Sequence, residues 1–212
     1  MLCLGVDTTG NWCSSALVDE AKILARQTIA IDHKSGAGQG EVLAPMVQGL
    51  LKSAGIAPAN IGKIAVCTGP GSFSGVRIGL SFAKGFALPH GIPVIGVSAL
   101  EVWALSADPA HNKSVFAAAD IRRQQVFWQV WNNGKPAKPP QRSDVPTAQK
   151  HVGAMEITGS GAELLRSRPH SGYICPAKLA WLGLEKNVET HPATPLYHRP
   201  PDAKLPGGKS LA

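Results

Sequence analysis

Cysteine pairs, long apolar runs and a leader segment are absent from this sequence. Its four cysteines form no C-x-x-C pair, so the sequence indicates neither a disulfide-stapled small domain nor a zinc-binding dithiol. No apolar stretch approaches the roughly 18 residues that a membrane-spanning helix requires. The chain reaches Asp7 without the basic segment of a signal peptide. We therefore expect a cytoplasmic protein with reduced thiols and no membrane partner.

Familiar catalytic patterns are also missing. The seven histidines form no H-x-x-x-H pair, so the sequence predicts no zinc or iron site. It contains no G-x-S-x-G nucleophile motif. A glycine-rich segment begins at Gly69, but Ser74 and Gly75 stand where a Walker A loop needs glycine and lysine. The residues alone therefore indicate no catalytic set.

The composition that remains is that of an ordinary globular protein. Of the 212 residues, 44% are hydrophobic and 17% are charged, which argues against a disordered chain and fits one large domain or two small ones. Lys and Arg number 14 against 8 Asp and Glu within residues 105–212, and 7 against 6 within residues 1–104. The basic half predicts either a nucleic-acid partner, with Arg122 and Arg123 as candidate phosphate contacts, or a solvated positive surface.

The order of the predicted elements indicates an α/β protein with a mixed sheet. In residues 1–104 the hydrophobic pattern predicts three successive strands followed by alternating helices and strands. The predicted strands are 2–6, 14–18, 23–31, 61–68 and 93–97, and the predicted helices are 42–53, 75–88 and one that starts after Ser98. This order implies an antiparallel start that parallel strands extend through helical crossovers.

The second half is less regular, and we expect it to form a smaller lobe. Its predicted strands are 115–119, 126–131 and 152–158, and its predicted helices are 162–167 and 177–184. Twelve of the 17 prolines follow residue 104, which predicts long loops. We place the boundary in the polar segment near 105–112, so that the two lobes are residues 1–104 and 105–212.

Two segments at strand ends are candidate anion-binding loops. The turn after the first strand combines an acid with hydroxyl groups, which can hold Mg²⁺ and a phosphate, although the same residues suit a plain hairpin turn. The glycine-rich loop before the helix at 75–88 can present backbone N–H groups to an anion, or it can be a tight turn with Ser74 as the N-cap of that helix. The candidate residues are Asp7, Thr8, Thr9, Gly69, Gly71 and Ser72.

The helices at 42–53 and 75–88 are apolar around most of their circumference. The second of them carries a ridge of small residues at successive i+4 positions, which permits another helix to approach closely. Because a crossover helix usually presents one polar face to water, this pattern favours a subunit interface; the alternative is that the second lobe covers both helices. The candidate interface residues are Val42, Met46, Leu50, Gly75, Val76, Gly79, Leu80, Ala83 and Ala87.

Several separated motifs, in order, resemble those of the bacterial TsaB (YeaZ) family. They are GPGSFSGVRIG at 69–79, GVDTT at 5–9, DIRRQQV at 120–126 and PLYHRP at 195–200. The sequence departs from the family where Gln39 replaces a frequent histidine and where Gln124 replaces a glycine. The first departure puts any role of that histidine in doubt for this chain.

The resemblance implies an ASKHA-type fold (the class of actin, Hsp70 and sugar kinases), with two ribonuclease H-like lobes, the second one reduced. It implies a scaffold that is not an enzyme by itself, in the complex that adds threonylcarbamoyl to N6 of adenosine 37 of tRNAs reading A-starting codons. The implied partners are a catalytic TsaD-type subunit bound through the first-lobe helices, a TsaE-type ATPase, tRNA through the complex, and a second copy when the chain is alone.

The same resemblance implies no tightly bound cofactor, with ATP or ADP and Mg²⁺ acting only at the level of the complex. The 7–10 turn and the 69–75 loop would then be vestigial. The alternative is an ATP-dependent phosphotransferase or hydrolase of the ASKHA superfamily, parts of which carry an older glycoprotease-like label. That enzyme would use Asp7 and the 69–75 loop.

Overall fold

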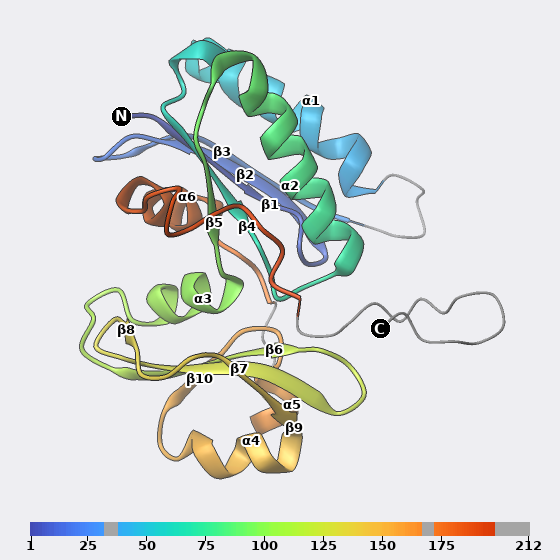
Figure 1. The fold of residues 1–212 in the computed structure, drawn as a ribbon, viewed down its shortest axis with the longest axis vertical. Coiled ribbons are helices and arrows are strands. Elements are labelled where there is room, and N and C mark those ends of the chain that lie inside the picture. The colour runs from blue at the N-terminus through green and yellow to red at the C-terminus, as the bar shows by residue number, and fades with distance from the viewer. Residues whose placement is uncertain (32–37, 167–171, 198–212) are drawn as a thin grey trace, which may run out of the picture.

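The computed structural model describes residues 1–31, 38–166 and 172–197, which form two lobes with a helix between them (Figure 1). Each lobe contains one mixed β-sheet. The predicted class, a two-lobed α/β protein with a smaller second lobe, is confirmed. None of the described helices is long and apolar enough to cross a membrane.

The first sheet has the pairing that the sequence predicts. Its strands are β1 (Cys3–Asp7), β2 (Trp12–Val18), β3 (Ile23–Ala30), β4 (Lys63–Cys67) and β5 (Val94–Val97). Their spatial order is β3-β2-β1-β4-β5. β1 pairs antiparallel with β2 and parallel with β4, so the sheet changes from antiparallel to parallel pairing at its central strand.

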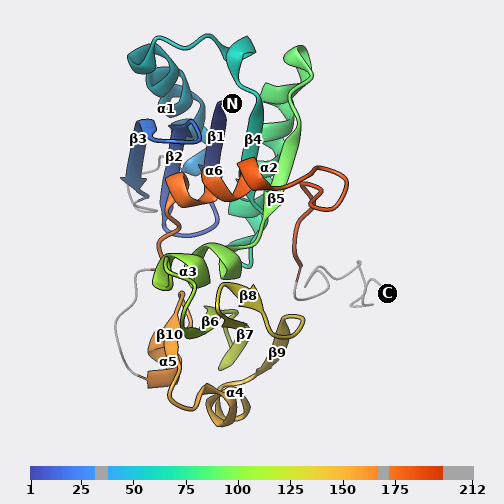
Figure 2. The same cartoon turned by 90° about the vertical axis from the view of Figure 1, so that its left-hand side faces the viewer.

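Helices cover both faces of the first sheet. α1 (Gln39–Ala54) and α2 (Phe73–Ala87) pack on one face, and α6 (Pro176–Glu185) crosses β1, β2 and β4 on the other (Figure 2). Two short 3-10 helices, Pro58–Asn60 and Leu88–His90, follow α1 and α2. The parallel strands are therefore buried from both sides, as is usual where helical crossovers connect them.

The second lobe is built on β6 (Ser114–Asp120) and β7 (Gln125–Asn132). Short strands extend this pair, namely β8 (Lys135–Pro136), β9 (Gln141–Asp144) and β10 (Glu156–Thr158), and its other helices are α4 (Val145–Val152) and α5 (Ala162–Arg166). The sequence analysis missed α4 and predicted a strand that begins at Val152. The local signal was Asp144, which caps the helix by accepting a hydrogen bond from Thr147 N at 2.8 Å, followed by a proline in the first turn.

α3 (Ala99–Ala107) lies between the lobes and is buried from both sides. One continuous apolar cluster joins side chains of α3 to those of β6 and β7 on one side and of α6 on the other. Trp103 belongs to this cluster, and its Nε1 donates to Tyr173 O at 3.0 Å. Since the two sheets share one core, their mutual orientation is held by apolar burial.

The predicted extent of the second lobe is wrong for the last part of the chain. Residues assigned to 105–212 return to the first lobe, where α6 packs on the first sheet. The segment after α6 then runs along the outer edge of β5, where Gly96 N donates to His191 O at 2.9 Å. The sequence shows that α6 has an apolar face but not which sheet covers it.

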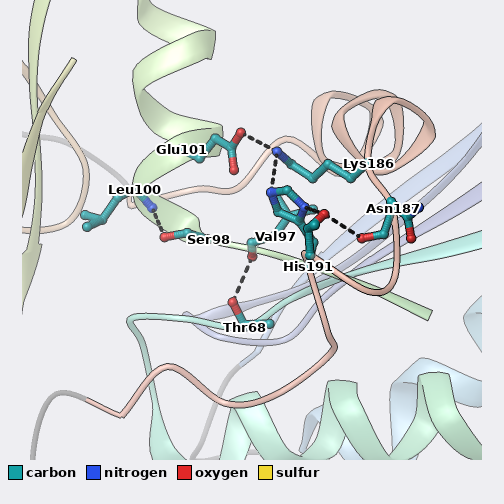
Figure 3. A network of polar contacts seen from close by, with 9 residues as sticks. Thr68, Val97, Ser98, Leu100, Glu101, Lys186, Asn187 and His191 are labelled. Atoms are coloured by element: carbon teal, nitrogen blue, oxygen red, sulfur yellow. Dashed lines mark hydrogen bonds and ion pairs between the residues drawn. The ribbon is translucent and has the colours of Figure 1, made fainter. Parts of the chain in front are cut away.

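Polar contacts hold this returning segment, which we call the strap (residues 186–197), against α3 and β5. Lys186 Nζ lies 2.8 Å from Glu101 Oε1, and both side chains are largely buried (Figure 3). His191 Nε2 lies 3.4 Å from the same ammonium group. Lys63 Nζ donates to the carbonyls of Leu184 and Lys186 at 2.8 and 2.7 Å, which satisfies carbonyl groups at and just beyond the end of α6.

α6 approaches the first sheet through glycines. A Cβ built on Gly183 would collide with Ala65 Cβ, and a Cβ built on Gly5 would collide with the carbonyl oxygen of Pro176. By contrast, a Cβ on Gly49 in the middle of α1 would meet no atom within 4 Å. Two glycines inside helices therefore have opposite structural roles.

We predict opposite effects for Gly183→Ala and Gly49→Ala. Gly49→Ala should raise the free energy of unfolding by about 1 kcal/mol, because alanine favours a helix over glycine. Gly183→Ala should lower it by about 1 to 3 kcal/mol, because the new methyl group overpacks the contact between α6 and β4. Urea unfolding of both variants measures the two effects, and a stabilised Gly183→Ala would contradict this account of α6.

Candidate functional site

The fold brings the two candidate anion-binding segments together. The turn at 7–10 follows β1 and the loop at 68–72 follows β4, and these strands are parallel neighbours, so their carboxyl ends lie side by side. The backbone N–H of Ser72 donates to Thr9 O at 2.7 Å. In Figure 1 this contact lies at the end of the first sheet that faces α3.

The loops are packed on each other and leave little room for an anion between them. Thr8 Oγ1 donates to Gly75 O at 2.7 Å, and Asp7, Thr8 and Thr9 are all buried. A Cβ on Gly71 would lie 2.6 Å from Thr9 O. Gly71 therefore allows the turn after β1 to pack directly against the loop.

Backbone groups of the 68–72 loop are hydrogen-bonded to three other segments. Besides the bond from Ser72 to Thr9, Gly69 O accepts from Ala99 N at 2.8 Å, and Thr68 O accepts from Leu196 N at 2.9 Å. Ser72 Oγ accepts from Gly75 N at 3.2 Å and caps α2. The loop thus joins the β1 turn, α3 and the strap. The cap expected at Ser74 is Ser72, because α2 begins at Phe73 and not at Gly75.

Asp7 closes its own turn. Its Oδ1 accepts hydrogen bonds from the backbone N–H and the hydroxyl of Thr9, at 3.0 and 2.7 Å. Burial raises the pKa of Asp7 to about 6, and the bonds from Thr9 limit that rise. Burial likewise raises the pKa of the neighbouring Cys67 thiol well above its usual range, so Cys67 is held as a neutral thiol. Asp7, Thr9 and Cys67 thus form a buried polar cluster at the carboxyl ends of β1 and β4.

Gln39 contributes to the same region from α1. Its side chain is buried, and Nε2 donates to Gly10 O at 3.0 Å. The residue that replaces the family's frequent histidine thus ties the first turn of α1 to the turn after β1. The sequence marked Gln39 as a departure but did not reveal this contact.

The predicted interface stripes on α1 and α2 are buried in the protein's own core, and this prediction is corrected. Met46, Leu50, Val76, Leu80, Ala83 and Ala87 are each at most 5% exposed, Gly75 and Gly79 are also buried, and Val42 is half-buried. A Cβ on Gly79 would lie 2.7 Å from Thr8 Oγ1. The small-residue ridge lets α2 approach the sheet and the β1 turn, and the covering surface is neither a subunit nor the second lobe.

The surface of α1 and α2 that remains exposed is the opposite one. On α2 it consists of Ser74, Ser81 and Gly85, which are exposed, with half-buried Ile78 among them. On α1 it consists of Glu41, Pro45, Gln48 and Lys52, all exposed. α1 therefore has a polar face, contrary to the expectation that both helices lack one. We call these residues the outer helix face.

Arg122 and Arg123 lie on the tight turn between β6 and β7. With Gln124 they have positive φ angles of 67°, 56° and 55°, and both arginines are exposed. Arg122 Nη1 lies 3.8 Å from Asp120 Oδ2. Residues 108–166 hold eight Lys and Arg against five Asp and Glu, so half of the basic excess of the second half lies outside this lobe.

In the described residues no group of three or more His, Cys, Asp or Glu side chains is placed to share a metal ion. Two groups of polar atoms lie at the strand ends: Asp7 with Thr9, and the backbone of the 68–72 loop. Both are hydrogen-bonded to other parts of this chain. The polar contacts at the strand ends therefore join structural elements of the fold.

Comparison with known proteins finds relatives that are named for tRNA modification. A family model described as TsaD, tRNA N6-adenosine threonylcarbamoyltransferase, matches residues 37–137. The tRNA threonylcarbamoyladenosine biosynthesis protein TsaB of Escherichia coli is 36% identical over 129 residues, which cover 60% of this chain and 54% of that protein. The Bacillus subtilis protein of the same name is 34% identical over 128 residues, covering 60% and 53%. The chain thus spans about half the length of the curated relatives it matches.

A solved structure extends the likeness to nearly the whole chain. YeaZ from Pseudomonas aeruginosa superposes with a TM-score of 0.74 and 26% sequence identity, covering 92% of this chain and 99% of that one. The chain thus resembles the TsaB (YeaZ) proteins over nearly its whole length. This likeness agrees with the motifs at 5–9 and 69–79, which are the two segments that pack together at the sheet end.

We predict that Asp7→Asn changes how stability depends on pH. The pKa of Asp7 is about 6 in the folded chain and about 3.9 in an unfolded one. Between these values the folded state holds a proton that the unfolded state releases, so this group increases the free energy of unfolding as pH falls from 7 towards 4. The expected contribution is on the order of 2 kcal/mol, and Asp7→Asn should remove it.

Urea unfolding at pH 4.5 and pH 7.5 measures this difference. Asp19→Asn is the matched control, because backbone hydrogen bonds from Ala21 and Lys22 lower the pKa of the exposed Asp19. The stability that Asp19 contributes is present at neutral pH and lost as pH falls, which is the opposite of the change expected for Asp7. Equal pH dependence of Asp7→Asn and the wild type would contradict the buried-carboxyl assignment.

Proposed function

We propose that this protein is a non-catalytic, cytoplasmic subunit of the machinery that adds a threonylcarbamoyl group to N6 of adenosine 37 of tRNAs reading A-starting codons. The observation that carries the proposal is the packing of the 68–72 loop on the β1 turn. Backbone groups of this loop are hydrogen-bonded within the chain, which supports a structural role for it. The names of its TsaB relatives and the full-length likeness to YeaZ support the same pathway.

The shared core supports a scaffold role. A nucleotide-processing enzyme of a two-lobed fold needs a cleft that can close around its substrate. Here α3 fills the junction, and a Cβ on Gly159 of the second lobe would lie 2.6 Å from Cε3 of Trp103. A rigid body of this kind is suited to presenting a surface to another protein.

The partner proposed for that surface is a catalytic TsaD-type subunit, bound at the outer helix face. Exposed Ser81 and Gly85 allow a second helix to approach α2 closely, while Glu41 and Lys52 of α1 can pair with charges on the partner. The proposal also includes a homodimer through the same face when the chain is alone, a TsaE-type ATPase, and ATP or ADP with Mg²⁺ only in the complex. It includes tRNA bound through the complex, with Arg122 and Arg123 as contacts.

Complementation tests the function. In E. coli cells depleted of TsaB, expression of this chain should restore threonylcarbamoyladenosine in tRNA, measured by mass spectrometry of tRNA digests. If the foreign subunits do not assemble, this chain and the TsaD-type and TsaE-type proteins of its own genome should restore it together. Failure of the complete set, with all proteins soluble, would contradict the proposal.

Substitution on the outer helix face tests the partner surface. Ser81→Glu should weaken binding of the TsaD-type protein at least tenfold, because it places a charge in a close helix contact. The matched control is Ser106→Glu, which changes an exposed serine on α3 and should leave the affinity unchanged. Isothermal titration calorimetry measures both, and equal binding by the two variants would place the interface elsewhere.

A second candidate function is an ATP-dependent phosphotransferase or hydrolase. The observation that favours it is the position of Asp7 and the 68–72 loop at adjacent parallel strand ends, where such folds bind ligands. On this hypothesis the isolated chain binds Mg-ATP with micromolar affinity and loses that binding in Asp7→Ala. On the scaffold proposal, titration calorimetry should detect no binding of Mg-ATP by the isolated chain.

A further inference from the structure

A guanidinium group is held by two exposed aromatic side chains at the start of α2, a cluster that we call the clamp. Arg77 Cζ lies 3.8 Å from the centroid of the Phe73 ring and 5.9 Å from that of Tyr197. Arg77 Nε donates to the hydroxyl of Tyr197 at 3.0 Å. The two rings lie 5.5 Å apart. Phe73 and Arg77 come from α2 and Tyr197 from the end of the strap, so the cluster joins segments 120 residues apart.

This clamp fixes the direction of the Arg77 guanidinium. The ring of Phe73 covers one face of the guanidinium, and Nε donates a hydrogen bond to the Tyr197 hydroxyl. Among residues 1–31, 38–166 and 172–197, no acceptor binds the two terminal nitrogens, and the side chain is exposed. The Arg77 side chain has therefore already lost much of its rotamer entropy in the free protein, so less is lost when a ligand binds.

The free edge of the guanidinium suits a planar anion with two oxygens. Two parallel N–H groups bind a carboxylate in bidentate fashion, which is stronger and more directional than a single ion pair. No acidic side chain of the described residues is paired with Arg77. Within the described residues, the free edge of the guanidinium is therefore available to a carboxylate of another molecule.

The surroundings favour a protein carboxylate. Phe73 is 49% exposed and Tyr197 is 48% exposed, and exposed aromatic side chains beside an arginine are typical of the centres of protein interfaces. The rings contact each other, so no nucleobase can enter between them. The cluster also lies on α2, on the same helix as the outer helix face.

We propose that Arg77, held by Phe73 and Tyr197, receives an Asp or Glu carboxylate of the TsaD-type partner. This inference rests on the proposed function and adds a specific anchor to it. The anchor couples the strap to the interface, because the Tyr197 hydroxyl that orients Arg77 belongs to the chain segment returning from α6.

Titration calorimetry with the TsaD-type protein tests the anchor. Arg77→Gln should weaken binding about tenfold to a hundredfold, as expected for removing one partner of a desolvated charge pair. Arg77→Lys should recover only a small part of this loss, because lysine keeps the charge but not the planar fork. Tyr197→Phe, which keeps the ring and removes the hydroxyl, should weaken binding a few-fold. Lys22→Gln, an equal charge loss on the exposed β2–β3 turn, is the control and should have no effect.

The outcomes separate this proposal from the one on which it rests. If the wild-type chain does not bind the TsaD-type protein, both are overturned. If the wild type binds and Arg77→Gln binds equally well, only the carboxylate receptor is overturned. If Arg77→Gln instead reduces salt-dependent binding of tRNA by the complex and leaves subunit affinity unchanged, Arg77 contacts phosphate and the receptor proposal is wrong. Rescue of Arg77→Glu by reversing one partner carboxylate would identify the group that is bound.

Discussion

The close contact between the 68–72 loop and the turn after β1 is the constraint on which the rest of this structure depends. Thr8 bonds to the first turn of α2, and Gly75 and Gly79 leave no side chain between that helix and the turn. Because α2 packs closely on β1 and β4, its ridge of small residues is buried in the core. Ser74, Ser81 and Gly85 lie on the opposite side of the helix and are exposed. One contact thus joins the two candidate anion-binding segments and determines which face of α2 is exposed.

The same loop connects parts of the chain that are distant in sequence. Gly69 holds the start of α3, and Thr68 holds the strap through Leu196. α3 in turn carries the apolar core that unites the lobes. The glycine-rich loop therefore acts as a structural junction, and the clamped Arg77 lies one helical turn beyond it. An interface anchored at Arg77 would therefore lie next to the loop that joins the β1 turn, α3 and the strap.

These connections explain why some sequence predictions succeeded and others failed. The mixed pairing of the first sheet was predicted because local hydrophobic patterns and short crossovers restrict the pairing of neighbouring strands. The segments at 7–10 and 69–75 were each predicted as candidate anion-binding loops because both follow predicted strands, and the parallel pairing of β1 and β4 brings them together. The interface stripes were placed on the wrong side of α1 and α2, because an apolar stripe on a helix shows that the stripe is covered and not which surface covers it. α4 was missed because its eight residues carry only three buried positions.

The sequence by itself determined the fold class, the mixed first sheet, the likeness to the TsaB (YeaZ) proteins and the two loop segments. Those features depend on the hydrophobic period and on residues close together in the chain. Tertiary structure decided that α6 returns to the first sheet, that Asp7 and Ser72 serve internal contacts, and that Arg77 meets Tyr197 across 120 residues. The physical reason is that burial and hydrogen bonding act between surfaces, and which surfaces meet depends on packing of the whole chain.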